Sequence, residues 1–308
     1  MPTRREFLIG GGAALAGAAA LGLYTWQIEP HWVQVVRRPM PLARLPESLV
    51  GRTVLQISDL HVGPRVDSGY LIETLQEAKR LTPDVVLFTG DFITYRSPAQ
   101  LEELARVLVH APHGRLATVA ALGNHDFGVG WRQLDVADRV AEMVRGAGAI
   151  VLRNDVTNVE GLQIVGMGDY WSPDFGPPRP VRSLLSAPPR KPGAPELRDA
   201  TETLARVDSQ APTIVLCHNP DAVDEPIWGD LQGWVLAGHT HGGQCKPPFL
   251  PPPVLPVRNR RYTAGAFDVG PGRTLYINRG LGHLIQVRFN VRPELTLFTL
   301  ERTTGSPS

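Results

Sequence analysis

The sequence predicts a single large α/β domain that follows a short targeting segment. About 280 residues remain once the first ~28 are set aside, a length that one large α/β domain can hold. Apolar residues make up 43% of the chain, which is enough for a sizeable core and too many for a disordered chain. The 31 glycines and 29 prolines predict tight turns and long ordered loops instead of a helical bundle.

Short apolar runs bounded by turn residues predict the strands of this domain. Val85–Phe88 is apolar throughout, so we expect that strand to be covered on both faces. Prolines after the first run predict an irregular link that reaches Pro46. In chain order, the expected strands are Val33–Val36, Arg52–Ser58, Val85–Phe88, Leu116–Leu122, Ile150–Leu152, Leu162–Val165, Thr213–Leu216, Trp234–Ala237, Thr274–Ile277, Val287–Phe289 and Leu295–Leu300.

Helical patterns lie between several of these strands. Asp67 or Ser68 is a suitable N-cap for a helix that ends near Leu81, and Pro98 is well placed in the first turn of the next helix. Residues 171–198 are rich in Pro and Arg and lack periodicity, which predicts a long loop over one face. The expected helices are residues 68–81, 98–109, a helix that ends near 145 before Gly146 and Gly148, and residues 201–207.

Composition and charge exclude several classes of protein. Lys and Arg number 31 against 30 Asp and Glu, which leaves a formal net charge of +1. There is thus no basic excess to hold a polyanion by counterion release, and no nucleic-acid partner is expected. The two cysteines, Cys217 and Cys245, are too few for a disulfide-dense scaffold or a four-cysteine zinc module.

The N-terminal segment has the features of an export signal. The pair Arg4–Arg5 precedes a stretch rich in Gly and Ala that carries no charge between Glu6 and Glu29. This pattern is typical of twin-arginine signals, which are less apolar than ordinary transmembrane helices. The same uncharged stretch is also long enough to cross a bilayer if it is not removed. We therefore expect residues 1–29 to be a twin-arginine signal or an N-terminal membrane anchor, and residues 30–308 to form the folded domain.

Five of the expected strands end at a cluster of Asp, Asn or His side chains. Five of the nine histidines of the chain lie at these strand ends. In open α/β sheets, ligand sites form beyond the carboxyl ends of the strands, so we expect these groups to converge. The clusters are Asp59 with His61, Asp91, Asn124 with His125 and Asp126, His218, and His239 with His241.

Carboxylate oxygens and imidazole nitrogens in such numbers suit divalent transition metals such as Mn, Fe, Zn, Co or Ni. The absence of cysteine from the set argues against structural zinc. The set holds more ligands than one ion needs, and two ions ~3.5–4 Å apart that share one carboxylate would use them. Two such cations would lower the pKa of a bridging water and bind the oxygens of a phosphate, which predicts hydrolysis of phosphoric esters by a bridging hydroxide.

The separate motifs differ in specificity. An Asp-x-His pair or a lone Gly-Asp at a strand end is often only a turn with a surface histidine. Gly123–Asp126 and the Gly-His-Thr-His-Gly-Gly-Gln run of residues 238–244 are more specific, because flanking glycines allow a close backbone approach. All five clusters in order at strand ends argue against coincidence.

With these motifs the sequence resembles the calcineurin-like metallophosphoesterase superfamily. The family motifs are D-x-H, G-D, G-N-H-[DE], a single His and G-H-x-H, and the resemblance spans roughly Thr53 to Gln244. The Gly-Gly-Gln ending and the tail motifs at residues 278–282 and 288–290 are similar to a bacterial, twin-arginine-exported branch of phosphodiesterases that act near membranes or the cell wall. The motifs stand here as Asp59–His61, Gly90–Asp91, Gly123–Asp126, His218 and Gly238–His241.

The resemblance implies a fold and a set of roles. The fold would be two mixed β-sheets face to face, flanked by helices in a four-layer α-β-β-α sandwich, with residues 30–308 as one metallophosphoesterase domain. The cofactors would be two divalent ions, Mn, Zn or Fe. By resemblance, Asp59, His61 and His241 would hold the first ion, Asp91 would bridge, and Asn124, His218 and His239 would hold the second, while His125, oriented by Asp126, would contact the phosphate and protonate the leaving oxygen.

Several readings of the function remain open at this stage. A phosphodiester or pyrophosphate substrate, including lipid-linked or cell-wall-derived ones, is favoured over a phosphoprotein. Hydrolysis of a sugar-nucleotide lipid such as UDP-2,3-diacylglucosamine, known for relatives, is an alternative. Export argues against it, because that cytosolic intermediate would be absent outside the cytoplasm. A non-catalytic metal-binding adaptor is a further alternative, but such a protein would be expected to have lost ligands, and none is replaced here.

Other segments carry weaker signals. The proline-rich Lys246–Val257 is expected to form an apolar wall for a lipid-like group or, more simply, a rigid surface loop. Arg258–Arg261 is either a candidate binding site for a second phosphate or a solvated charged turn. Arg279 and His283 are candidate substrate contacts, and Cys217 is expected to pack in the core.

Replacing Arg4 and Arg5 together by lysine is expected to retain the protein in the cytoplasm, because the transport receptor reads the paired guanidinium groups. Cell fractionation with immunoblotting measures the outcome, and the Arg37→Lys/Arg38→Lys variant is the matched control. Normal appearance of the Arg4→Lys/Arg5→Lys protein outside the cytoplasmic membrane would refute the assignment of the N-terminus.

Overall fold

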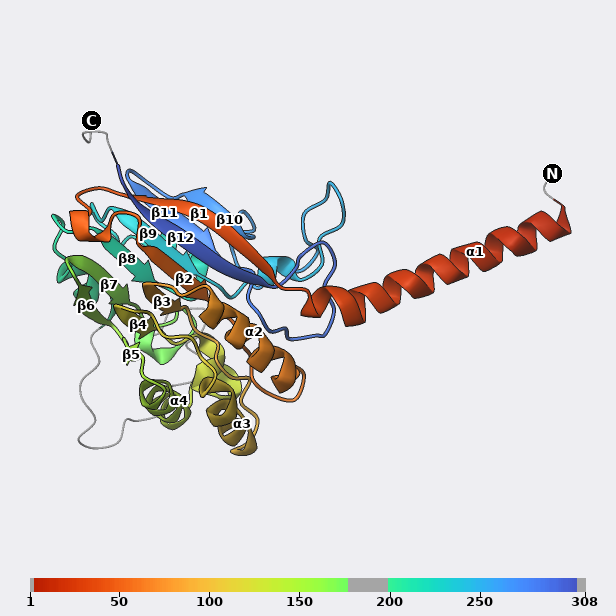
Figure 1. Ribbon diagram of the computed structural model, residues 1–308, viewed down its shortest axis with the longest axis horizontal. Helices are drawn as coiled ribbons and strands as arrows, with labels where there is room; N and C mark the ends of the chain where they lie inside the picture. The colour runs from red at the N-terminus through yellow and green to blue at the C-terminus, as the bar shows by residue number, and fades with distance from the viewer. Residues whose placement is uncertain (1–2, 177–198, 304–308) are drawn as a thin grey trace.

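Two six-stranded mixed sheets stack face to face in the computed structural model of the chain (Figure 1). The structure describes residues 3–176 and 199–303, without the side chains of residues 4–9. The first sheet has the order β1 (Gln34–Leu42), β12 (Glu294–Arg302), β2 (Thr53–Ile57), β3 (Val85–Phe88), β4 (Ala117–Ala120) and β5 (Ile150–Val151). The second has the order β10 (Gly265–Asp268), β11 (Arg273–Ile277), β9 (Gly233–Ala237), β8 (Thr213–Leu216), β7 (Leu162–Gly166) and β6 (Asp155–Val159).

The pairing within each sheet brings several carboxyl ends to one edge. Strands β2, β3, β4 and β5 are mutually parallel, as are β7, β8, β9 and β11. Antiparallel pairs lie toward the edges, between β12 and β2, β10 and β11, and β6 and β7. The short buried runs of the sequence therefore form the parallel centre of each sheet, where both faces are covered.

Apolar side chains fill the space between the sheets and the outer faces. Between the sheets, the ring of Phe298 on β12 lies 5.6 Å from Trp234 on β9 and 5.0 Å from Tyr276 on β11. Helices α2 (Ser68–Arg80), α3 (Ala99–Leu108) and α4 (Leu134–Gly146) cover the outer face of the first sheet, and α5 (Ala200–Ala205) packs on the second. These layers confirm the predicted α-β-β-α sandwich.

Most predicted elements are present, and the Asp67 side chain caps α2 as predicted, accepting the Tyr70 N–H at 2.7 Å. The first strand is longer than predicted and runs through Pro39 and Pro41. Proline is tolerated there because β1 is an edge strand, bonded to β12 alone. Strands β6 and β10, which are short or polar, were not predicted.

The strand predicted at Val287–Phe289 was wrong. Only an isolated bridge joins Phe289 to Cys245, because this segment turns inward to bury Arg288 instead of extending along a sheet. Of the predicted loop at 171–198, residues 177–198 lie outside the described residues.

The N-terminal helix α1 (Arg4–Leu23) extends away from the body of the sandwich (Figure 1). Within the described residues, no helix reaches the combination of length and apolarity that a membrane span requires. Residues 24–33 connect α1 to β1, and the backbone of Thr25 accepts a hydrogen bond from Arg288 N–H.

Candidate metal centre

All of the polar clusters predicted at strand ends meet at one place. Strands β2, β3 and β4 of the first sheet and β8 and β9 of the second each end two to four residues before a cluster, so both sheets contribute. No predicted metal ligand has an exposed fraction above 5%. These ligands are Asp59, His61, Asp91, Asn124, His218, His239 and His241.

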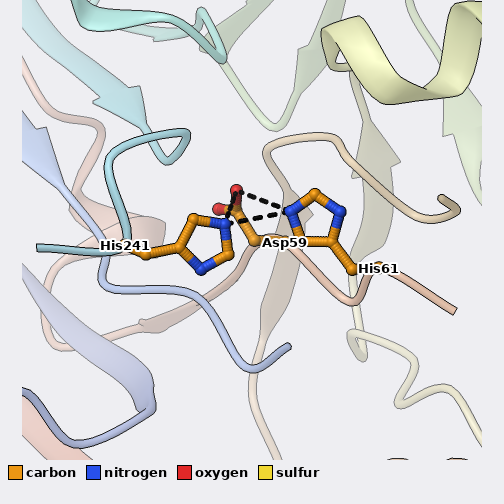
Figure 2. Close-up of side chains that lie close together, drawn as sticks. All are labelled: Asp59, His61 and His241. Atoms are coloured by element: carbon orange, nitrogen blue, oxygen red, sulfur yellow. Dashed lines mark hydrogen bonds and ion pairs between the residues drawn. The ribbon is translucent and has the colours of Figure 1, made fainter. Parts of the chain in front are cut away.

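The first group consists of Asp59, His61 and His241, whose polar atoms point toward one another (Figure 2). Asp59 Oδ1 lies 3.2 Å from His241 Nε2 and 3.7 Å from His61 Nε2, and the two ring nitrogens are 2.9 Å apart. Ligands of an ion bonded at ~2.0–2.2 Å lie about 3–3.5 Å from one another. The spacing of these three atoms therefore suits a shared cation.

The second group consists of Asp91, His218 and His239, with Asn124 beside it. His218 Nε2 lies 3.0 Å from Asp91 Oδ2, and the same oxygen lies 3.6 Å from His61 Nε2 of the first group. Both amide atoms of Asn124 are buried and find no hydrogen-bond partner in the described part of the chain. The Asp91 carboxylate thus lies between the two groups.

Hydrogen bonds on the far side of two imidazole rings direct the lone pair of the neutral ring to the inner nitrogen. His218 Nδ1 donates to the Thr89 carbonyl at 2.8 Å, and His239 Nε2 donates to the Pro256 carbonyl at 2.8 Å. Because a carbonyl only accepts, each neutral ring keeps a lone pair on its other nitrogen. This is the tautomer that a metal ligand requires.

The charges of neighbouring groups shift the pKa values of Asp91 and His218 in opposite directions. Burial opposes ionisation of Asp91, but the neighbouring His218 holds the pKa of Asp91 below its usual value. Burial lowers and the Asp91 carboxylate raises the pKa of His218, and the net result lies well above the usual value. A buried acceptor without a donor costs about 1–3 kcal/mol, and a divalent cation would satisfy several at once. The donor set fits the predicted Mn, Zn or Fe.

Five of the seven predicted ligands have left-handed backbone conformations. Their φ angles lie between +49° and +69°, a region that residues other than glycine rarely adopt. Such residues cost of the order of 1–3 kcal/mol each and persist where the surrounding structure dictates them. The five are Asp59, His61, Asp91, His239 and His241.

Glycines beside the ligands allow the close approach that the motifs predicted. A Cβ on Gly123 would lie 2.2 Å from Asp91 Oδ1. A Cβ on Gly238 would lie 2.0 Å from Ser58 Oγ and 2.2 Å from Asp59 Oδ2. The approach is thus made to the carboxylates of the centre itself.

The Asp126 side chain accepts hydrogen bonds from backbone N–H groups and none from an imidazole ring in the described part of the chain. Its carboxylate is fully buried, and none of its hydrogen bonds in the described part of the chain reaches the ring of His125, which resemblance to the family had led us to expect it to orient. The carboxylate instead ties the Asp91 loop to the Gly123 loop. It accepts N–H groups from Asp91 at 2.9 Å, Phe92 at 2.8 Å, Ile93 at 3.2 Å and Gly123 at 2.8 Å.

His125 lies at the half-buried margin of the centre. Its backbone N–H donates to Asp91 Oδ1 at 2.8 Å, and its ring lies edge-on to His61 at 4.9 Å. Burial lowers the pKa of His125 to about 4. The ring is therefore neutral near pH 7, and it also offers a nitrogen within reach of His61 and Asp91.

Two tryptophans beside the centre were not anticipated from the sequence. Trp131 and Trp171 stack with centroids 5.1 Å apart, Trp131 lies 5.7 Å from His125, and Trp171 meets His239 edge-on at 4.5 Å. Both lie in irregular segments without a motif, so no sequence pattern could have identified them.

The weaker candidates have other contacts. Arg279 pairs with Glu294 and donates to Gln34, and buried His283 bonds the Arg65 carbonyl at 2.8 Å. Arg258 donates to the Tyr170 hydroxyl at 3.1 Å. Cys217 is fully buried, as predicted for core packing.

Comparison with known proteins gives a consistent result. The family model for calcineurin-like phosphoesterases matches residues 52–243. The phosphodiesterase YaeI of Escherichia coli K12 is 31% identical over 97% of this chain and 100% of its own. The uncharacterized metallophosphoesterase YkuE of Bacillus subtilis is 32% identical over 98% of both chains. The UDP-2,3-diacylglucosamine pyrophosphatase LpxG of Chlamydia trachomatis is 26% identical over 94% of this chain and 97% of its own.

Asp91→Asn and His239→Ala are each expected to lower the metal bound per chain and to abolish hydrolysis, because each removes a ligand and Asp91→Asn also removes the charge between the two groups. Metal analysis of purified protein measures occupancy, with Asp230→Asn and His113→Ala, which alter exposed side chains, as controls. Full occupancy with an unchanged rate in either variant would contradict the two-ion site.

Proposed function

The chain belongs to the calcineurin-like phosphoesterase family and is a metal-dependent phosphoesterase, and from this premise we propose that it hydrolyses phosphodiester or pyrophosphate bonds at a centre of two divalent ions. The position of Asp91 carries this proposal. One carboxylate oxygen lies 3.0 Å from His218 Nε2 and 3.6 Å from His61 Nε2, between two groups that each suit one cation. In this assignment Asp59, His61 and His241 hold one ion, Asn124, His218 and His239 hold the other, and Asp91 is shared by both.

The two ions, when bound, would supply Lewis acidity toward water and the phosphoryl oxygens. The residues of the chain hold the geometry. The carbonyls of Thr89 and Pro256 keep the rings of His218 and His239 in the ligand tautomer. The four N–H bonds to Asp126 keep the loop of Asp91 fixed against the loop of Gly123. Rigid placement of this kind keeps the reorganisation that accompanies the reaction small.

His125 is assigned to the substrate and not to a metal ion. Its ring lies at the margin of the centre, less buried than the seven assigned ligands. The neutral imidazole N–H is placed to donate to a phosphoryl oxygen. A bound phosphate anion raises the pKa of the ring, because nearby negative charge favours the protonated form, and the ring then donates a proton to the departing oxygen.

The names of the relatives support a phosphate that is linked on both sides. One relative is described as a phosphodiesterase and another as a UDP-2,3-diacylglucosamine pyrophosphatase. The second name supports a sugar-nucleotide lipid as the alternative substrate class. A non-catalytic adaptor receives no support, because all seven assigned ligands are assembled.

We also propose that the protein is exported by the twin-arginine route and acts outside the cytoplasm, on lipid-linked or cell-wall-derived phosphoesters. The paired arginines and the uncharged stretch up to Glu29 support this location. Residues 1–29 would then be the signal or anchor, residues 30–308 the enzyme, and the chain would belong to the exported phosphodiesterase branch.

Purified protein loaded with Mn, Zn or Fe is expected to hydrolyse bis-p-nitrophenyl phosphate faster than p-nitrophenyl phosphate, since the centre is assigned to diesters. Metal analysis of the same sample should give about two ions per chain. Chelation should abolish the activity and metal return should restore it. A metal-loaded protein that cleaves only the monoester would contradict the assignment of the substrate class.

His125→Ala is expected to retain both ions and to lower kcat by roughly 10²–10⁴-fold, the usual contribution of a lost general acid. The loss should be small for a p-nitrophenolate leaving group, which barely needs a proton, and large for an alkyl diester. Loss of metal would instead identify His125 as a ligand. An equal defect for both leaving groups would indicate charge stabilisation rather than proton transfer.

A further inference from the structure

Exposed apolar side chains are concentrated at one end of the molecule. Of the fifteen large hydrophobic side chains exposed in the described part of the chain, eleven lie in three segments, residues 15–35, 249–254 and 285. Phe249 is 105% exposed and Val254 71%, whereas Leu255 of the same loop is buried, so the loop covers only part of its apolar surface. We name seven of the eleven the apolar rim: Trp26, Ile28, Trp32, Phe249, Leu250, Val254 and Ile285.

Backbone hydrogen bonds join the three segments into one surface. Lys246 N–H donates to the Phe289 carbonyl, which connects the loop of residues 246–257 to the segment of Ile285. On its other side that segment bonds the N-terminal connection, through Arg288 N–H to Thr25 and the Gln286 side chain to Trp26. Figure 1 shows the loop projecting from the body at the same end as α1.

Cationic side chains lie near the apolar rim. Residues 245–263 contain Lys246, Arg258, Arg260 and Arg261 and no Asp or Glu, although the whole chain is nearly balanced. In residues 279–292, Arg288 is buried and Arg279 pairs with Glu294, while the guanidinium of Arg292 lies 3.9 Å from the centre of the Trp32 ring. Exposed tryptophan and leucine beside lysine and arginine are typical of surfaces that lie on anionic lipid.

The apolar rim is also connected to the metal centre. Pro256, at the end of the rim loop, accepts the hydrogen bond of His239, and Gln244, three residues after His241, donates to the Ile285 carbonyl at 2.7 Å. Upstream, the rim continues into α1, which carries no charge after Glu6. The rim is therefore linked to the assigned ligands by hydrogen bonds and by short stretches of chain.

We propose that the apolar rim docks on the surface of an anionic lipid bilayer. Phe249, Leu250 and the two tryptophans enter the interface, and Lys246 with the nearby arginines contacts the headgroups. The docking itself does not depend on the proposed function. Only its consequence does, namely that the phosphoesterase works at the membrane on substrates presented there. A second copy of the chain would not be expected to cover this surface, because two cationic loops would then face each other.

Brominated-lipid quenching of full-length protein tests the position of the rim. Phe249→Trp and Val109→Trp each add one tryptophan at an exposed position, the second at the end of α3. With vesicles of brominated phosphatidylglycerol and phosphatidylcholine, the fluorescence added at position 249 should be strongly quenched and that at 109 should not. Equal quenching at both positions would overturn the proposal. The absence of quenching at 249 would also overturn it, and this is the result expected if α1 alone attaches the protein.

Vesicle binding of substituted proteins gives a second measurement. Phe249→Ser/Leu250→Ser should weaken binding to phosphatidylglycerol vesicles roughly tenfold or more, since two large apolar side chains no longer leave water. Lys246→Gln should weaken it roughly fivefold, and only on anionic vesicles. Val109→Ser/Ile150→Ser is the matched control and should bind normally. Equal binding by all variants, or a change of oligomeric state in lipid-free solution with unchanged vesicle binding, would overturn the proposal.

The same variants separate this inference from the proposed function. Phe249→Ser/Leu250→Ser should hydrolyse soluble bis-p-nitrophenyl phosphate at the rate of the unsubstituted protein. If the unsubstituted, metal-loaded protein fails to hydrolyse that compound but binds vesicles through position 249, the proposed function is refuted. The docking proposal then still holds.

Discussion

Buried carboxylate and imidazole groups that face one another within 3.7 Å are the constraint on which the rest of this structure depends. Asp59, His61 and His241 direct oxygen and nitrogen lone pairs toward a common point, and Asp91 and His218 do the same beside them. In a medium of low dielectric such an arrangement is unfavourable without a cation. The scaffold therefore has to hold these groups together against their own repulsion, and two stacked sheets whose central strands end beside the centre provide that rigidity.

Several devices transmit the rigidity of the sheets to the loops. The carboxylate of Asp126 gathers four backbone N–H groups from two loops. On the opposite side, buried Arg288 donates to the carbonyls of Arg279, Gly280, Gly282 and Val291, and so clamps the turn that packs on Asp59. A carboxyl group that accepts from amides and a guanidinium that donates to carbonyls thus flank the centre. Together they stabilise the left-handed conformations of the ligand residues, which are costly in isolation.

Rigid and adaptable parts are divided between sheets and loops. The ligands directly follow parallel strands with buried apolar sides, while His125, the two tryptophans and the apolar rim lie on irregular segments. This division is common in enzymes, because a fixed scaffold maintains the reacting geometry while loops define what reaches it. The rim lies at the same end of the molecule as α1, so docking on lipid would orient the sandwich without demanding a change in the metal centre.

The sequence alone determined most of the order of elements and identified the candidate ligand residues, since apolar strands such as Val85–Phe88 and glycine-flanked motifs such as Gly238–His241 are local patterns. Short-range chemistry also sufficed for the Asp67 cap of α2. Tertiary structure decided what depends on partners distant in sequence. It turned Val287–Phe289 inward around Arg288, carried β1 through two prolines at an edge, and directed the Asp126 carboxylate to backbone amides. It also gathered Trp26, Phe249 and Ile285 on one surface, because exposure is a property of the whole fold and no residue spacing encodes it.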